Sequence, residues 1–522
     1  MHHYLEQSAA NLPDKEAIVQ GERRYSYKEF NNIASGLGNM LKKAGCSRMD
    51  RVGVFLDHSI DQVFSFFGIL KTGCVYVPVN SLLLSKQVSH IAEDSQFKAL
   101  IIDDHRLELL KEIIPGWSFL TCLIVSGKMP EWAKALDLTL FSFEQAINDR
   151  DNPIPPLHSP CIGADLAALL YTSGSTGKPK GVMISHDNLI AGATIVTGYL
   201  NNHHDDRLLG VLPLSFDAGL NQVTGSVYLG MTYIMKSFRF PGELVKELLK
   251  EKITGFAGIP TIWLLLLQTG SSVYKHEFPD LRYITNTGGT LPLHAVEKLK
   301  QVFPKTQIVL MYGLTEAFRS TYLPPDMLDK RPTSMGKAIP GVEILVVGKN
   351  GKLCPSGEVG ELVHRGPTVS LGYWNNPEKT NKVFRSNHFL PAGTEATERI
   401  VFSGDLVKKD EDGYLYFVSR DDHMIKCHGH RISPAEIEEV LYASGRIKLC
   451  AAIGLPDPIR GQTIKIYATP QDGENIEPQD IIDMCAVVLP TFMLPKEVVF
   501  LAEMPRTATG KIDIALLKQN SL

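Results

Sequence analysis

One segment gathers residue types that bind polyphosphates. The sequence YTSGSTGKPKG occupies residues 171–181 and follows the apolar run Leu166 to Leu170, so it leaves a predicted strand. Its glycines permit close backbone approach to a ligand. Its other residues add hydroxyl and ammonium donors that suit phosphate oxygens; these donors are Thr172, Ser173, Ser175, Thr176, Lys178 and Lys180.

The loop differs from two well-known phosphate-binding motifs. A Walker loop needs glycine where Thr172 stands and serine or threonine where Pro179 stands. The sequence also contains no G-x-G-x-x-G, so a dinucleotide fingerprint has no support. A flexible surface linker is the simpler interpretation, but a linker has no reason to place lysines and a rigid proline at one end.

Six further motifs follow in the order of a known superfamily. They are LPLSF at 212–216, NTGGTLP at 286–292, YGLTE at 312–316, SGDL at 403–406, YFVSRDDHMIKCHGHRISPAEIE at 416–438 and PRTATGKID at 505–513. With these blocks the chain resembles an AMP-forming acyl-CoA synthetase. The adenylate-forming superfamily also holds nonribosomal peptide adenylation domains and firefly-type luciferases. The resemblance runs from about Tyr4 to Asp513, and LPLSFDAGLNQ and YGLTEAFRSTYLPP favour the exosortase-associated acyl-CoA ligase subgroup.

The resemblance implies a two-step reaction. A carboxylate and ATP give acyl-AMP and pyrophosphate, and a thiol then takes the acyl group and releases AMP. ATP and Mg²⁺ are the implied cofactors, and CoA or the phosphopantetheine of an acyl carrier protein is the implied acceptor. Because two anions must meet, positive groups have to surround both.

The phosphate-binding roles carry over by resemblance. Glu316 is expected to position Mg²⁺, Thr315 to bind a phosphate oxygen, and Arg431 to meet a phosphate in one domain orientation. The leaving phosphates are expected to contact Thr172, Ser173, Gly174, Ser175, Thr176, Gly177 and Lys180.

The adenosine site carries over in the same way. Gly288, Gly289 and Thr290 would flank adenine, and Tyr312, followed by Gly313, would stack on its other face. Asp405, which we place at a hairpin end, would accept hydrogen bonds from the ribose with support from Arg420. The family motif Gly-Arg is Ser419-Arg420 here, a departure that affects the approach to the hinge.

Three residues after the predicted domain boundary carry the implied domain movement. Lys511 would bridge the substrate carboxylate and the α-phosphate, Asp422 would be the hinge, and Gly429 would let a pantetheine arm pass. The histidine pairs His203-His204 and His428-x-His430 resemble metal ligands. Neighbouring residues rarely point at one ion, so we interpret both pairs as turn residues.

The acyl pocket leaves the substrate open. Phe216 would be its aromatic gate, and Asp217 follows in apolar surroundings, where a carboxylate needs a partner. In peptide-synthetase adenylation domains a similar aspartate binds the substrate's α-amino group, so an amino acid is one hypothesis. Alternatively Arg319 neutralises Asp217, or Arg319 holds a second carboxylate, and the substrate is then a short or medium acyl acid or a dicarboxylic acid.

Other function classes remain as alternatives. A stand-alone amino-acid adenylating enzyme would load a carrier protein. A luciferase-like oxygenase shares the adenylation step. A non-catalytic adenylate binder would predict loss of Lys511, Glu316 or the 171–181 loop, and none of these is lost.

The helices and strands that would position these residues predict an α/β fold. Strand-like runs alternate with helical stripes in the first half, which predicts a large N-terminal domain of mostly parallel sheets (1–420) with a small β-rich subdomain after about residue 335. A small mobile α+β C-terminal domain (421–522) follows. Capping boxes are predicted at Ser26 to Glu29 and at Ser433 to Glu436.

Composition fits a soluble enzyme. The 522 residues are 44% hydrophobic and 21% charged, with a net charge of −4, so nothing in the overall charge attracts nucleic acid or anionic lipid. The eight cysteines form no C-x-x-C pair and are expected to be buried thiols. Without a secretory signal or an integral membrane segment, a cytoplasmic location is predicted.

Overall fold

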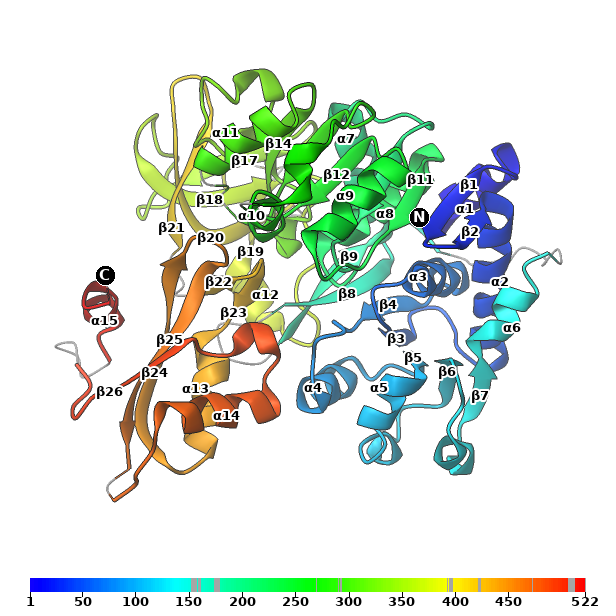
Figure 1. Ribbon diagram of the computed structural model, residues 1–522, viewed down its shortest axis with the longest axis horizontal. Coiled ribbons are helices and arrows are strands. Elements are labelled where there is room, and N and C mark those ends of the chain that lie inside the picture. Colours follow the sequence, from blue (N-terminus) through cyan, green and yellow to red (C-terminus); the bar gives the residue numbers. More distant parts are fainter. Residues whose placement is uncertain are drawn as a thin grey trace.

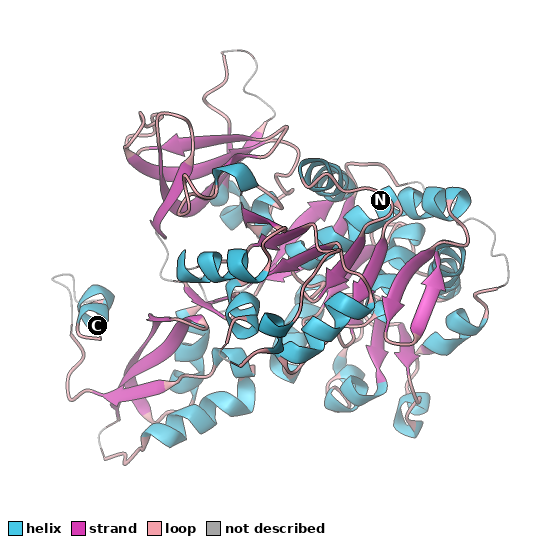
Figure 2. Ribbon diagram, turned by 45° about the horizontal axis from the view of Figure 1, so that its top comes forward, coloured by secondary structure: helices cyan, strands magenta, loops and turns pink. Residues whose placement is uncertain are grey.

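The computed structural model describes residues 1–151, 157, 161–172, 179–268, 270–289, 291, 293–391, 393, 398–420, 424–471, 473–505 and 512–521. It confirms the predicted fold class. A large N-terminal domain holds layered α/β sheets and a small antiparallel sheet, and a small α+β domain follows (Figure 1). The N-terminus lies on the layered body, while the C-terminus lies on the small domain set to one side (Figure 2).

Two large sheets form the layered body. The first is parallel except at its ends and has the order β16 (Lys337–Ala338), β15 (Thr321–Leu323), β14 (Gln307–Tyr312), β13 (Tyr283–Asn286), β12 (Gly255–Gly258), β10 (Arg207–Gly210), β11 (Thr232–Met235), β1 (Glu16–Gln20), β2 (Arg23–Ser26). The second is parallel except for its last pair and has the order β7 (Thr139–Ser142), β6 (Cys122–Ser126), β5 (Ala99–Asp103), β3 (Arg51–Phe55), β4 (Val75–Pro78), β8 (Leu166–Thr172), β9 (Lys180–Ser185).

Helices cover both faces of each large sheet. The shared layer between the sheets contains α1 (His2–Asn11), α2 (Tyr27–Lys43), α3 (Ile60–Thr72), α6 (Phe143–Asn148), α7 (His186–Tyr199) and α8 (Asp217–Leu229). The outer face of the first sheet is covered by α9 (Pro241–Lys250), α10 (Pro260–Leu266) and α11 (Leu293–Val302). The outer face of the second is covered by α4 (Ser85–Ser95) and α5 (Asp104–Leu109).

The remaining elements build the two smaller sheets. The antiparallel sheet of the N-terminal domain contains β17 (Glu343–Val347), β18 (Val359–Arg365), β20 (Arg399–Lys409), β19 (Phe384–Ser386) and β21 (Leu415–Arg420), beside α12 (Pro377–Val383). The C-terminal sheet contains β23 (His430–Ile432), β22 (Ile425–Cys427), β25 (Gly461–Pro470), β24 (Ile447–Asp457) and β26 (Glu497–Phe500).

The C-terminal sheet has a different helix layer on each face. One face packs against α13 (Pro434–Ala443) and α14 (Pro478–Val488), and the other packs against α15 (Ile514–Gln519). The short 3₁₀ helices of the chain are η1 (Ile114–Gly116), η2 (Glu131–Ala135), η3 (Ser272–Lys275), η4 (Thr315–Ala317), η5 (Pro325–Met327) and η6 (Thr491–Met493).

One of the two predicted capping boxes forms. The Ser26 hydroxyl accepts from the Glu29 amide at 3.2 Å, and the Glu29 carboxylate accepts from the Ser26 amide at 2.8 Å. At the second site α13 begins as predicted, but the buried Ser433 makes no capping hydrogen bond. The prediction of a box there is wrong, because Glu436 turns toward the N-terminal domain instead.

All eight cysteines are unbridged, and seven are buried as expected; Cys161 is partly exposed. Among the helices of the described residues, none combines the length and the apolar character that crossing a bilayer requires.

The two serines provide a matched stability test. Ser26→Ala removes a complete capping box and should lower the free energy of unfolding by about 1 kcal/mol. Ser433→Ala removes a hydroxyl that caps nothing and should change it by less than about 0.5 kcal/mol. Urea unfolding followed by circular dichroism measures both. Equal losses for the two variants would contradict the assignment of the caps.

Candidate functional site

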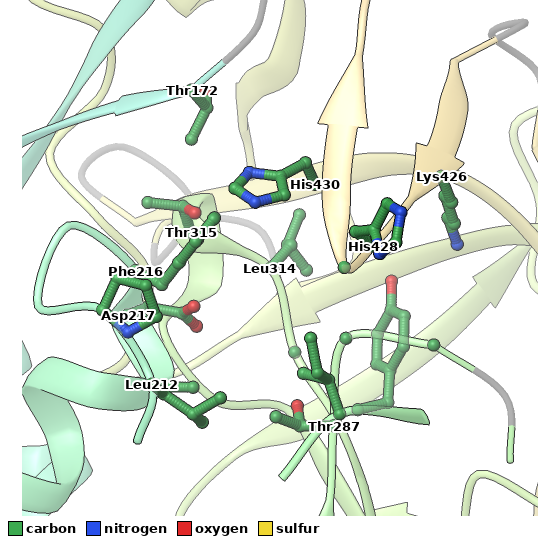
Figure 3. A pocket seen from close by; sticks show the side chains of 18 of the residues that line it. Thr172, Leu212, Phe216, Asp217, Thr287, Leu314, Thr315, Lys426, His428 and His430 are labelled. Atoms are coloured by element: carbon green, nitrogen blue, oxygen red, sulfur yellow. The ribbon is translucent and has the colours of Figure 1, made fainter. Parts of the chain in front are cut away.

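A cavity of about 310 Å³ lies where the strand ends of both large sheets meet the C-terminal domain. Figure 3 shows Phe216, Asp217 and Thr315 of the N-terminal domain on one side of it and His428 and His430 of the C-terminal domain nearby. The predicted site residues that line it are Thr172, Phe216, Asp217, Gly288, Gly289, Tyr312, Gly313, Thr315 and Gly429.

The phosphate loop joins two paired strands at the cavity wall. Thr172 ends β8 and pairs with Lys180, which begins β9. The Thr172 hydroxyl oxygen is buried, lines the cavity and has no hydrogen-bond partner among the described residues. The predicted loop residues between these strands lie outside the described residues; they are Ser173, Gly174, Ser175, Thr176 and Gly177.

Lys180 and Glu316 form an ion pair that the sequence did not reveal. Lys180 Nζ lies 3.0 Å from Glu316 Oε1 and donates to the Tyr373 hydroxyl at 2.7 Å. The Tyr373 hydroxyl also donates to Glu316 Oε1 at 2.7 Å. The Glu316 carboxylate therefore accepts from both Lys180 and Tyr373. The residue is only 5% exposed, so these contacts are shielded from water. Tyr373 escaped prediction because it belongs to no motif block.

Tyr312 and Asp405 are brought together from two sheets. Tyr312 ends β14, and its hydroxyl donates to Asp405 Oδ2. Asp405 lies inside β20 and is fully buried, so its predicted place at a hairpin end is wrong. Its backbone pairs with Arg420, whose side chain lies outside the described part.

Glycines form the wall beside the expected adenine position. Gly288 has φ +75°, a conformation that side-chain-bearing residues rarely adopt. A Cβ at Gly288 would lie 3.2 Å from Ile259, and one at Gly289 would lie 3.3 Å from Pro260. The backbone therefore fits closely between α10 and the cavity. Thr290 lies outside the described residues.

Asp217 and Arg319 meet as one of the sequence hypotheses expected. Asp217 begins α8 and lines the cavity, while Arg319 follows η4 and is 5% exposed. Arg319 Nη1 lies 3.4 Å from Asp217 Oδ2, a long contact beside the 2.7–2.9 Å of strong charged pairs.

The C-terminal domain contributes an aromatic wall that sequence reasoning missed. The His430 ring stacks on Phe492 with centroids 3.7 Å apart and meets Phe216 edge-on at 5.0 Å. Burial lowers the pKa of His430 to about 4, so this ring is neutral at pH 7. Phe492 lies in η6, far from any motif, and only the tertiary fold reveals it.

Gly429 lines the cavity and meets the N-terminal domain at Ile259. It has φ +78°, and a Cβ there would lie 2.7 Å from Ile259 Cδ1. Arg431 follows in β23, with its side chain outside the described part. Asp422 and Lys511 also lie outside the described residues.

The residues flanking Lys511 lie on the far face of the C-terminal sheet. Met504 and Ile512 pack with Leu517 of α15 against β24 and β25. The cavity instead receives Glu436 and Phe492 from the opposite face. Figure 1 shows α15 at the outer side of the domain.

The histidine pairs behave differently from one another. The ligand atoms of His203, His204 and Asp205 lie within 4.8 Å of one another on the exposed surface. His204 and Asp205 lie in a turn, as expected, although the three side chains lie close together. His428 and His430 line the cavity, and burial lowers the pKa of both.

Glu436 links α13 to α4 of the N-terminal domain. Gln87 donates from Nε2 to the Val488 carbonyl at 2.7 Å and also hydrogen-bonds the Glu436 carboxyl. Burial raises the pKa of Glu436 to about 7, and Glu439 adds to the rise, while the bond to Gln87 and the charge of Lys86 oppose it.

Comparisons with known proteins identify the family. The chain matches the AMP-binding enzyme family over residues 5–374 and the AMP-binding enzyme C-terminal domain over residues 436–511. The chain therefore belongs to the AMP-binding enzyme family.

The relatives include two kinds of protein. Tyrocidine synthase 1 of Brevibacillus parabrevis is 30% identical over 100% of this chain and 45% of its own length. Gramicidin S synthase 2 of Brevibacillus brevis is 29% identical over 98% of this chain and 11% of its own length. The chain thus spans less than half of these relatives. The long-chain-fatty-acid–CoA ligase FadD13 of Mycobacterium tuberculosis is 29% identical over 99% of this chain and 97% of its length.

Solved structures support the same fold. The amide bond synthetase McbA of Marinactinospora thermotolerans superposes with a TM-score of 0.85 at 21% identity, covering 99% of each chain. The anthranilate CoA ligase AuaEII, solved with anthranoyl-AMP, gives a TM-score of 0.72 at 26% identity and covers 99% of this chain and 96% of its own.

The pKa of Glu436 predicts a pH-dependent stability. Its value in the folded protein, about 7, lies above its ordinary value of 4.5, so the folded state binds more protons between these values. Stability should therefore fall by about 1–3 kcal/mol as pH rises through this window. Glu436→Gln should remove that slope in thermal unfolding measured from pH 5 to 8. Glu439→Gln should shift it to lower pH. Parallel wild-type and Glu436→Gln curves would contradict the interpretation.

Proposed function

We propose that the chain is an ATP-dependent carboxylate–thiol ligase that forms an acyl-adenylate and then a thioester. One observation carries the proposal. A single cavity joins the end of the phosphate loop, the Gly288-Gly289 wall, the acyl residues Phe216 and Asp217, and Gly429. Each of these groups of residues would serve a different part of the two-step reaction. Their position around one cavity therefore supports both steps.

The cavity residues fit ATP. Three buried oxygens that line it have no hydrogen-bond partner among the described residues; they are Thr172 Oγ1, Ser215 Oγ and Asn286 Oδ1. Such atoms favour a polar ligand, because leaving them unpaired is costly. The volume lies in the range of ordinary ligand sites.

Glu316 fits Mg²⁺ as a carboxylate ligand, since a hard cation prefers oxygen donors. When bound, the ion supplies neutralisation of phosphate charge. The chain's own contribution is to hold Glu316 in place through Lys180 and Tyr373. Thr315, at the cavity wall, offers a hydroxyl to a phosphate oxygen.

The chemistry then needs the two anions to be held side by side. In adenylation a carboxylate oxygen attacks the α-phosphorus, and pyrophosphate leaves from the opposite side. Gly288, Gly289 and Tyr312 hold adenine, and Asp405 with Arg420 holds the ribose. The phosphate loop, Lys180, Arg431 and Lys511 oppose the charge that gathers in the transition state.

The domain division serves the second step. We place the boundary at 420/421, with Asp422 as the hinge. In the arrangement described here the Gly429 side of the C-terminal domain faces the cavity, which suits thiol entry. A thiolate attacks the acyl carbonyl carbon, and AMP leaves with the electron pair. Rotation about the hinge brings Lys511 to the cavity for adenylation.

The acceptor is CoA or the phosphopantetheine of a carrier protein. A second candidate function, adenylation of an amino acid for a carrier protein, is favoured by Asp217, whose carboxylate faces the cavity (Figure 3). The unbridged cysteines suit a reducing, cytoplasmic location.

The primary test is ATP–pyrophosphate exchange over fatty, aryl, dicarboxylic and amino acids. Exchange reports adenylation without requiring the correct thiol. Exchange with at least one acid, followed by AMP release on adding CoA or a carrier protein, supports the proposal. No exchange with any acid would refute it.

Lys511→Ala and Gly429→Val form a reciprocal pair. Lys511→Ala should reduce exchange by roughly 100-fold or more, since it removes a cation aimed at transition-state charge. It should leave thiol attack on a synthetic acyl-adenylate within a few-fold of wild type.

Gly429→Val should do the reverse. A side chain there clashes with Ile259 and is strained at positive φ, so the thiol-accepting arrangement is lost while exchange persists. Persistent exchange also shows that this variant folds. Equal losses in both half-reactions, in either variant, would contradict the division of roles.

A further inference from the structure

A second, smaller cavity lies behind the acyl end of the main one. Its volume is about 40 Å³, and it shares Ala218, Thr287 and Met311 with the main cavity. Asp217 lines the larger cavity, whereas Arg319 lines the smaller one. Their 3.4 Å contact therefore lies at the boundary between the two spaces.

The Arg319 guanidinium is buried without full pairing. The residue is 5% exposed, and its Nε has no hydrogen-bond partner among the described residues. A Cβ placed on Gly313 would lie 3.7 Å from Nη1, so the guanidinium lies close to the YGLTE backbone. A planar fork of five donors whose guanidinium makes one long contact among the described residues retains donors for another anion.

Asn221 adds a second donor on the same inner wall. It lies one helical turn after Asp217 in α8, is 4% exposed, and its Nδ2 has no partner among the described residues. Thr285 and Asn202 extend the polar lining. An alkyl tail entering here would exclude water from both donors without hydrogen-bonding them, which carries a desolvation penalty.

We propose that this inner cavity is a subsite for a second carboxylate, so that the preferred substrate is a short dicarboxylic acid rather than a plain fatty acid. The inference rests on the proposed function and specifies its substrate class. One carboxylate reacts in the main cavity, and the other accepts hydrogen bonds from Arg319 and Asn221. The small volume admits a terminal carboxylate and excludes a long alkyl chain.

Asp217 does not occupy this subsite but lowers its affinity for a substrate carboxylate. The long Asp217–Arg319 contact holds the guanidinium near the boundary and leaves the inner donors available. A substrate carboxylate competes with Asp217 for the same cation. Removing the Asp217 charge should therefore strengthen binding of a dicarboxylate, whereas it should weaken binding of any substrate held through an amino group.

The test compares acids of equal carbon number in ATP–pyrophosphate exchange, namely glutarate with valerate and adipate with hexanoate. The wild type should favour the better dicarboxylate in kcat/KM by roughly 10- to 100-fold, the range for charged hydrogen bonds in a site built for them. Arg319→Met should abolish or reverse that preference through KM for the acid, with KM for ATP unchanged. Asn221→Leu should reduce the preference less.

Two further measurements separate the alternatives. Asp217→Asn should lower KM for the dicarboxylate, and Arg319→Lys should restore part of the preference lost in Arg319→Met. Thermal shift of wild type and Arg319→Met, with and without glutarate or adipate, reports binding independently of turnover and shows that the variant is folded.

The outcomes are distinct. A wild type that exchanges well but prefers valerate or hexanoate overturns the subsite, as does equal loss for both members of each pair in Arg319→Met. Exchange only with monoamino-monocarboxylic acids, made worse by Asp217→Asn, overturns it in favour of the amino-group hypothesis. Exchange with no acid at all refutes the proposed function instead.

Discussion

The ion pair between the partly buried Lys180 and the buried Glu316 joins the two large sheets beside the cavity. Lys180 begins β9 of one sheet, and Glu316 follows β14 of the other. Tyr373 closes the contact with hydrogen bonds to both side chains. Removing one partner of a buried pair typically costs about 3–5 kcal/mol, because the other charge stays behind. The same contact thus links the start of β9 to the YGLTE motif.

The contacts of the C-terminal domain are of a different kind. A neutral imidazole between two aromatic rings and a carboxyl shared with Gln87 replace the charged pairs of the N-terminal domain. The His430 ring is neutral at pH 7, and the Glu436 carboxyl, whose pKa burial raises to about 7, is only partly ionised at that pH. Contacts of this kind cost less desolvation to separate than a fully charged buried pair does.

The sequence predicted what local patterns determine. Apolar runs such as Ala99 to Ile102 and Ile308 to Met311 became strands, and the hydroxyl-rich loop joins two of them. Contacts between distant segments were not predictable. Tyr373 and Phe492 reach the site only through the tertiary fold, and no spacing relates them to it. Asp405 was expected at a hairpin end, whereas β20 continues through it.

Ser433 shows how tertiary contacts override a local signal. Its sequence pattern equals that of a capping box, yet the Glu436 carboxyl hydrogen-bonds Gln87 of α4 instead of the helix start.

The choice of substrate also depends on tertiary contacts. Peptide synthetases and fatty-acid ligases resemble this chain almost equally, at 30% and 29% identity, so relatedness does not select among acids. The pocket walls have to decide. A fatty acid would be expected to find an apolar end, but the inner wall presents Arg319 Nε and Asn221 Nδ2, which have no hydrogen-bond partner among the described residues. Burying a donor without a hydrogen-bond partner is unfavourable, so such donors normally have an acceptor. A second carboxylate of the substrate would provide that acceptor, and for this reason we favour an acid with two charged ends.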